Sequence, residues 1–181
     1  MNFRHTLTAC AVALAFGSAG AFAAGDKSVY DSTKTSAKAT YDTDKKGCDA
    51  LGGNAKDICQ AEAKAKRTKA ESMAEADWKG TPKAREDAVK ASAQADYDVA
   101  KERCDDKGGN AKDVCVKEAK AAMTKTVADA KATKKGSEAR MDAADSKRDA
   151  DYKVATEKCE SLSGDAKRAC VDSAKARFGK T

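Results

Sequence analysis

Six of the seven cysteines could do chemistry, because they form three pairs with the same spacing of ten intervening residues. The pairs are Cys48 with Cys59, Cys104 with Cys115, and Cys159 with Cys170. Paired cysteines can close a disulfide, bind a soft metal such as Cu(I), or carry out thiol redox reactions. The backbone that holds each pair decides between these reactions.

The spacing favours disulfides across a turn. On one continuous helix the two Cα atoms of a pair would lie ~16 Å apart, whereas a disulfide tolerates only ~7 Å. A glycine-containing turn lies inside every pair, at Gly52-Gly53, Gly108-Gly109 and Ser163-Gly164. Folding at this turn places the two cysteines opposite each other on antiparallel arms. We therefore predict three structural disulfides, an interpretation that the even cysteine count of an exported chain supports.

Metal binding and redox activity are the alternatives for these cysteines. The second cysteine of each pair lies in the first two turns of a predicted helix, where a thiol pKa is lowered. No Cys-x-x-Cys motif is present, however, and the only histidine, His5, lies in the predicted export signal. Without a histidine, the Ser-His-Asp and Cys-His arrangements and most zinc sites are excluded. We predict no enzyme activity, no cofactor and no metal site.

Aromatic residues accompany the cysteines at a fixed distance. Tyr41, Tyr97 and Tyr152 each lie seven residues before a cysteine, which is two helical turns back on the same face. Packing beside the disulfide explains them, and a stacking platform for a ligand is the alternative. Trp78 occurs once, near the end of a predicted helix. It is interpreted either as a packing anchor or as an exposed contact.

Comparison of the chain with itself reveals three related units. Residues 41–64 match residues 97–120 at an offset of 56, and match residues 152–175 more loosely, a further 55 residues on. Residues 84–88 match residues 139–143, also 55 residues on. The predicted division is a signal peptide over 1–23 and helical hairpin units over 24–80, 81–136 and 137–181.

Each unit is predicted to fold as helix, tight turn, helix. Thr81 is a candidate N-cap with Pro82 at the first helical position. The glycines of each turn are expected to end the first helix, and Asn54, Asn110 and Asp165 to cap the second. Gly80 and Gly136 are expected to end the second helices of two units, with Ser137 capping the helix that follows. The fold class is therefore all-α, with six helices in three disulfide-stapled antiparallel hairpins, arranged as an extended array or a loose bundle.

The N-terminus is typical of an export signal. Arg4 precedes a short apolar run, and Ala21-Phe22-Ala23 offers a cleavage site after Ala23, with Ala24 as the second choice. Leu7-Thr8-Ala9-Cys10 resembles a lipoprotein box, but such a box follows the apolar core and this one precedes most of it. No later segment is long and apolar enough to span a bilayer. We predict a protein of the bacterial periplasm with no transmembrane segment.

The remaining charge is spread along the chain. Loss of Arg4 leaves 34 basic and 29 acidic residues, a net charge of +5. Basic and acidic residues alternate, which is typical of a solvated helical surface and not of a nucleic-acid patch.

The alanine- and lysine-rich segments 119–122 and 128–132 resemble the helical stem of TolA, which links the two bacterial membranes. TolA-type proteins also have a membrane anchor and a globular domain, and they lack cysteine hairpins. The Cys-x10-Cys hairpin with Gly-Gly-Asn-Ala-Lys-Asp is similar to small exported bacterial proteins that are labelled TolA-like. The resemblance implies the periplasm and the cell envelope, and it transfers no functional residue.

The sequence favours a non-enzymatic structural or interaction protein of the envelope, with envelope proteins or cell-wall components as partners. The alternative is a stress-responsive binding module, either a helical chaperone or a thiol and metal buffer. Electrostatic binding to anionic lipid is a third hypothesis. The oligomeric state is not determined at this level.

Disulfide mapping tests the cysteine interpretation. In protein purified without reductant, we expect an intact mass with all six cysteines oxidised, and peptides linking 48 to 59, 104 to 115 and 159 to 170. Alkylatable thiols together with bound metal would contradict it and would favour the metal buffer.

Overall fold

The computed structural model describes residues 25–180, and every regular element in this range is helical. The elements are α1 (Lys27–Gly47), the short 3-10 helix η1 (Cys48–Ala50), α2 (Gly53–Lys79), α3 (Pro82–Cys104), α4 (Gly109–Cys159) and α5 (Gly164–Phe178). The predicted signal peptide lies outside the described residues. Within residues 25–180, no helix combines the length and the apolar character needed to cross a membrane.

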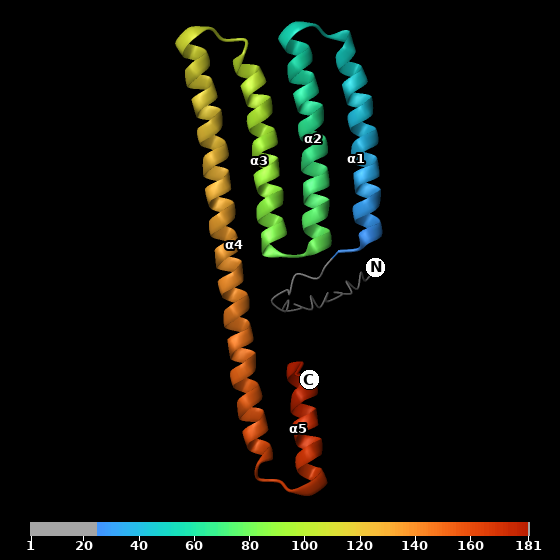
Figure 1. Ribbon diagram of the computed structural model, residues 1–181, viewed down its shortest axis with the longest axis vertical. Helices are drawn as coiled ribbons and strands as arrows, with labels where there is room; N and C mark the ends of the chain where they lie inside the picture. Colours follow the sequence, from blue (N-terminus) through green and yellow to red (C-terminus); the bar gives the residue numbers. More distant parts are fainter. Residues whose placement is uncertain (1–24, 181) are drawn as a thin grey trace, which may run out of the picture.

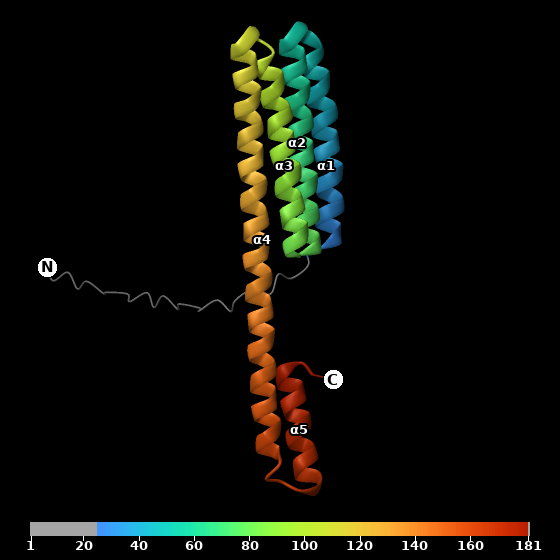
Figure 2. The same ribbon diagram turned by 60° about the vertical axis from the view of Figure 1, so that its left-hand side comes forward.

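The helices form a single layer. The first four lie side by side in antiparallel order, and α5 packs against the far half of α4 (Figure 1). Each of the five α-helices of the described chain contacts only its neighbours in sequence: α1 with α2, α2 with α3, α3 with α4, and α4 with α5. The turned view shows that the layer is thin (Figure 2). The helices of residues 25–180 therefore follow one another in a row.

Alanine forms most of the contact between neighbouring helices. Between α2 and α3, two buried clusters hold the helices together, with Ala65, Ala95 and Val99 in one and Ala76, Ala84 and Ala88 in the other. Small side chains let helices approach closely. Burial of apolar surface stabilises a fold by roughly 25 cal/mol per Å², and each alanine buries little of it. The interior of the layer is therefore thin.

The predicted break between α2 and α3 is confirmed. Gly80 adopts the left-handed conformation at the end of α2, with φ of 61°. The hydroxyl of Thr81 accepts a hydrogen bond from the backbone N–H of Ala84 at 3.1 Å, and Pro82 is the first residue of α3. Proline disfavours helical geometry at the residue before it, so the chain turns here.

The predicted caps at the cysteine turns are wrong. Asn54, Asn110 and Asp165 lie inside α2, α4 and α5, and the N-cap positions are Gly52, Gly108 and Ser163. The chain already leaves the first helix just after the cysteine, where the N–H of Leu51 bonds to the carbonyl of Cys48 at 3.0 Å. The glycines that follow the turn therefore begin the second helix and do not end the first.

The predicted helix end at Gly136 is also wrong. The helix α4 runs through Gly136 and Ser137 without interruption for 51 residues, about 75 Å at ~1.5 Å per residue. The described chain therefore has five α-helices and not six. The offset between units falls from 56 to 55 across this link, so it has one residue fewer than the Gly80-Thr81 link. It also lacks a proline. A lone glycine costs a helix only about 1 kcal/mol, and α4 continues.

Two alanine substitutions test the continuity of α4. A Cβ at Gly136 would meet only the Arg140 side chain at 3.8 Å, so Gly136→Ala should stabilise the helix by up to about 1 kcal/mol. Gly80→Ala is the contrast, because its left-handed φ strains alanine, and it should lower stability by about 1 kcal/mol. Thermal unfolding followed by circular dichroism measures both. A destabilised Gly136→Ala variant would show that the helix breaks at this glycine.

Candidate functional site

The three cysteine pairs are joined as disulfides in the structure. Each bond connects the two arms of a turn, and the Cα atoms lie 5.7 Å apart in all three. Cys48, Cys104 and Cys159 are fully buried, and their partners are half-buried. All six sulfurs are thus engaged with each other. Within residues 25–180, no cluster of three or more His, Cys, Asp or Glu residues is arranged to hold a metal ion.

These disulfides stabilise turns that are otherwise bridged by ion pairs of solvent-accessible side chains, such as Lys56 with Asp49 at 2.9 Å. Closing a loop of this size contributes about 2–3 kcal/mol by restricting the unfolded chain. Helices of this length are marginal in isolation, and the alanine contacts add modest burial. The chemistry of the cysteines in this structure is therefore structural.

The three tyrosines predicted to share one environment have three different ones. Tyr41 lines a groove over α1, α2 and α3, where the Arg67 guanidinium lies 5.5 Å from its ring. Tyr97 faces α4 from α3, and Tyr152 meets the edge of Phe178 at 6.2 Å. All three are half-buried.

Trp78 is a packing anchor at the end of the layer where α1 begins and α2 ends. Its ring stacks on Tyr30 of α1 at 4.9 Å, nearly parallel. Close by, the N–H of Gly25 donates to the carbonyls of Asp77 and Trp78 at 2.9 and 3.1 Å. The chain before α1 thereby satisfies carbonyls at the end of α2, which have no partner within their own helix. A Cβ at Gly25 would lie 2.9 Å from the Asp77 carbonyl oxygen, so only glycine fits.

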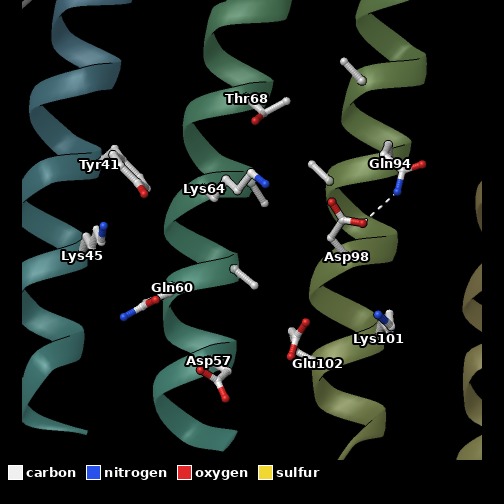
Figure 3. A pocket seen from close by; sticks show the side chains of 14 residues that line it. Tyr41, Lys45, Asp57, Gln60, Lys64, Thr68, Gln94, Asp98, Lys101 and Glu102 are labelled. Carbon is white, nitrogen blue, oxygen red and sulfur yellow. Dashed lines mark hydrogen bonds between the residues drawn. The ribbon is translucent and has the colours of Figure 1, made fainter.

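A groove of about 700 Å³ crosses one face of α1, α2 and α3. Its floor is small and apolar, made by Ala61, Ala65, Ala91 and Ala95. Charged and amide side chains from all three helices stand around this floor (Figure 3). The cationic side chains are Lys45, Lys64 and Lys101, and the acidic ones are Asp57, Asp98 and Glu102.

The charges of this groove differ from those of the surrounding surface. Elsewhere on α1 to α3 many charged side chains form ion pairs, such as Lys66 with Asp44 at 2.9 Å. Among the described residues, none of the six charged side chains in the groove takes part in an ion pair. Asp98 accepts a hydrogen bond from the Gln94 amide at 2.8 Å.

This groove was missed in the sequence. Its residues come from positions 41 to 102 on three helices, and each is an ordinary surface residue of an amphipathic helix. Only Tyr41 was singled out, as a possible stacking platform, and it lies at the groove. The helical spacing of Asp57, Gln60 and Lys64 was the one available signal, because it places them on one face of α2.

A buried carboxylate ties α3 to α4. Glu86 is only 6% exposed and forms ion pairs with Lys90 of its own helix and with Lys134 of α4, the latter at 3.7 Å. The hydrogen bond from Lys90 is the main cause that holds the pKa of Glu86 below its ordinary value of 4.5, with a smaller contribution from the Lys134 charge. The pair helps to fix α4 against α3.

The chain matches no protein-family model, no curated protein and no solved structure.

Glu86 should make stability depend on pH. Because its folded-state pKa is lowered, the stabilisation is present above pH 4.5 and is lost as the pH falls through the folded-state value. Glu86→Gln should lower the melting temperature at pH 7 and should approach the parent protein at acidic pH. Glu138→Gln, which removes a more exposed partner of the same lysine, should change little. Equal effects at all pH values would contradict the ion-pair explanation.

Proposed function

We propose that this protein is a non-enzymatic interaction protein of the bacterial cell envelope, and that the groove over α1, α2 and α3 binds a polypeptide segment. The observation that carries the proposal is the groove itself: an alanine floor bordered by three lysines and three carboxylates that have no ion-pair partner within the described chain. Both signs of charge are present in equal number. Such a surface suits a partner segment with side chains of both signs, and it gives no advantage to a polyanion.

The disulfides support the proposed location in the cell envelope. Disulfides form and persist in oxidising surroundings such as the bacterial periplasm, and they are rare in the cytosol. Three disulfides in a helical layer with a thin interior therefore support export, as does the N-terminal signal expected from the sequence. The thiol and metal buffer is less well supported, since all six cysteines are already paired with each other.

Crosslinking from within the groove tests the proposal. Gln60 lines the groove and lies between Tyr41 and Asp57 in the close view (Figure 3). A photoreactive phenylalanine analogue placed at position 60, in the full chain expressed in its host, should crosslink to a discrete envelope protein. The same analogue at position 66, which lies outside the groove lining, is the control and should not give this product.

Charge reversal then separates specific binding from proximity. Lys64→Glu changes a groove residue, whereas Lys66→Glu introduces the same charge two residues away, outside the groove lining. We expect Lys64→Glu to remove at least about nine-tenths of the crosslinked product, a loss of ~1.4 kcal/mol or more in binding. Lys66→Glu should leave most of it. Equal loss in both variants, or equal crosslinking from positions 60 and 66, would contradict the proposed groove.

A further inference from the structure

The helix α4 has one face that no other part of the described chain covers. Both α3 and α5 pack against the same side of α4 (Figure 1, Figure 2). On another side runs a stripe of six exposed apolar residues: Ala121, Ala132, Ala139, Ala143, Ala150 and, at the end that borders α5, Val154. They are 11, 7, 4, 7 and 4 residues apart. These intervals are close to whole numbers of helical turns, so all six share one face.

Each residue of the stripe corresponds to a buried residue between α2 and α3. With the offset of 56 found for residues 41–64, Ala65 and Ala76 of α2 correspond to Ala121 and Ala132. With the offset of 55 found for residues 84–88, four residues of α3 correspond to the rest of the stripe; they are Ala84, Ala88, Ala95 and Val99. The residue type is the same at all six positions. All six are buried between α2 and α3, and all six of their counterparts are exposed on α4.

The ion pairs across α2 and α3 have counterparts on α4 as well. Arg103 pairs with Glu62 at 2.5 Å, and Lys69 pairs with Asp96. The corresponding residues of α4 keep the charges, with Lys158 and Glu118 for the first pair and Lys125 and Asp151 for the second. None of these four takes part in an ion pair among the described residues. Both the apolar and the charged halves of an interface are therefore present without being joined.

A single chain in this conformation cannot bring the two halves of this interface into contact. The α2-like half lies before Gly136 and the α3-like half lies after it, on a single unbroken helix. A second copy in antiparallel orientation removes this obstacle. Ala132 of one copy then lies opposite Ala139 and Ala143 of the other, as Ala76 lies opposite Ala84 and Ala88 within the chain. The reciprocal contact forms at the same time, about a two-fold axis near Gly136.

We propose that this protein forms a symmetric dimer in which the two α4 helices pair antiparallel through this stripe. Each copy supplies the α3-like half that the other lacks, so the contact is self-complementary, as a two-fold interface requires. At each end of the dimer, the layer formed by helices α1 to α4 of one copy is extended sideways by two helical segments of the other copy. These segments are the second half of α4 and α5. The contact between α2 and α3 is the model for this interface, in its alanines and in its charge pairs.

Mass measurement with a matched pair of variants tests the dimer. Sedimentation or light scattering of the oxidised full chain should give twice the mass of one copy. Ala143→Glu puts a charge on the stripe and should raise the dissociation constant at least ~10-fold. Ala144→Glu changes the adjacent exposed alanine, which lies about 100° around the helix, and should leave the dimer intact. A monomeric parent protein, or equal behaviour of the two variants, would overturn the proposal.

Isotope-mixed crosslinking tests the register and excludes folding back within one chain. Protein with ¹⁴N and protein with ¹⁵N are mixed, unfolded in urea with disulfides intact, refolded, and treated with a carbodiimide that couples lysine to carboxylate. The dimer predicts a crosslink between Lys125 and Asp151 that joins a light peptide to a heavy one. Crosslinks that join only peptides of the same isotope would show that α4 bends at Gly136 and closes on itself, which would overturn the dimer.

Exchanging the two charges of a predicted ion pair tests the register of the dimer a second time. Lys125→Glu should weaken the dimer, and adding Asp151→Lys should restore it, because each exchanged pair faces its partner on the other copy. Failure of the double variant to recover the parent mass would contradict the proposed register. Circular dichroism of each variant shows whether the helices remain formed.

Discussion

Each cysteine turn of the layer is closed by a disulfide a few residues from the turn, and the alanine contacts beyond it could not replace that bond. The interface between α2 and α3 is made by alanines and one valine, so each residue removes little apolar surface from water. A helix of some twenty residues is marginal alone. The disulfide restricts the unfolded chain and keeps the two arms adjacent. Because of the disulfides, the chain can fold even though its helices are long, exposed and highly charged.

A single layer has consequences for the surface. Because each helix of residues 25–180 touches only its sequence neighbours, no other helix of this range covers either face of the layer. Many charged side chains on this surface form ion pairs within a helix or between adjacent helices, as Lys66 does with Asp44. The groove over α1 to α3 is the place where six charges surround an alanine floor without such pairing. This contrast, and not the size of the hollow, makes it the binding surface that we propose.

The unbroken α4 decides the shape of the rest. At Gly80 the left-handed glycine, the Thr81 cap and Pro82 together end one helix and begin the next. The corresponding link at Gly136 is one residue shorter and has no proline, and the helix passes through it. The last disulfide-closed turn is thereby carried away from the layer on the end of α4. Two faces that would meet in a bent chain are left on one straight helix, which is the basis of the proposed pairing of two copies.

The residue order alone was enough to determine features that depend on local geometry. The ten-residue cysteine spacing around a glycine turn favours a disulfide across the turn over a disulfide along one helix, and Thr81-Pro82 ends α2 by backbone sterics. The predicted helix end at Gly136 is wrong because a lone glycine leaves helix and turn close in energy. The absence of a proline and the shorter link then decide in favour of a continuous helix. Asn54, expected as a cap, instead donates to the Glu102 carbonyl at 3.0 Å. The groove and the stripe on α4 required the tertiary structure, since which faces are covered depends on packing between helices that are distant in sequence.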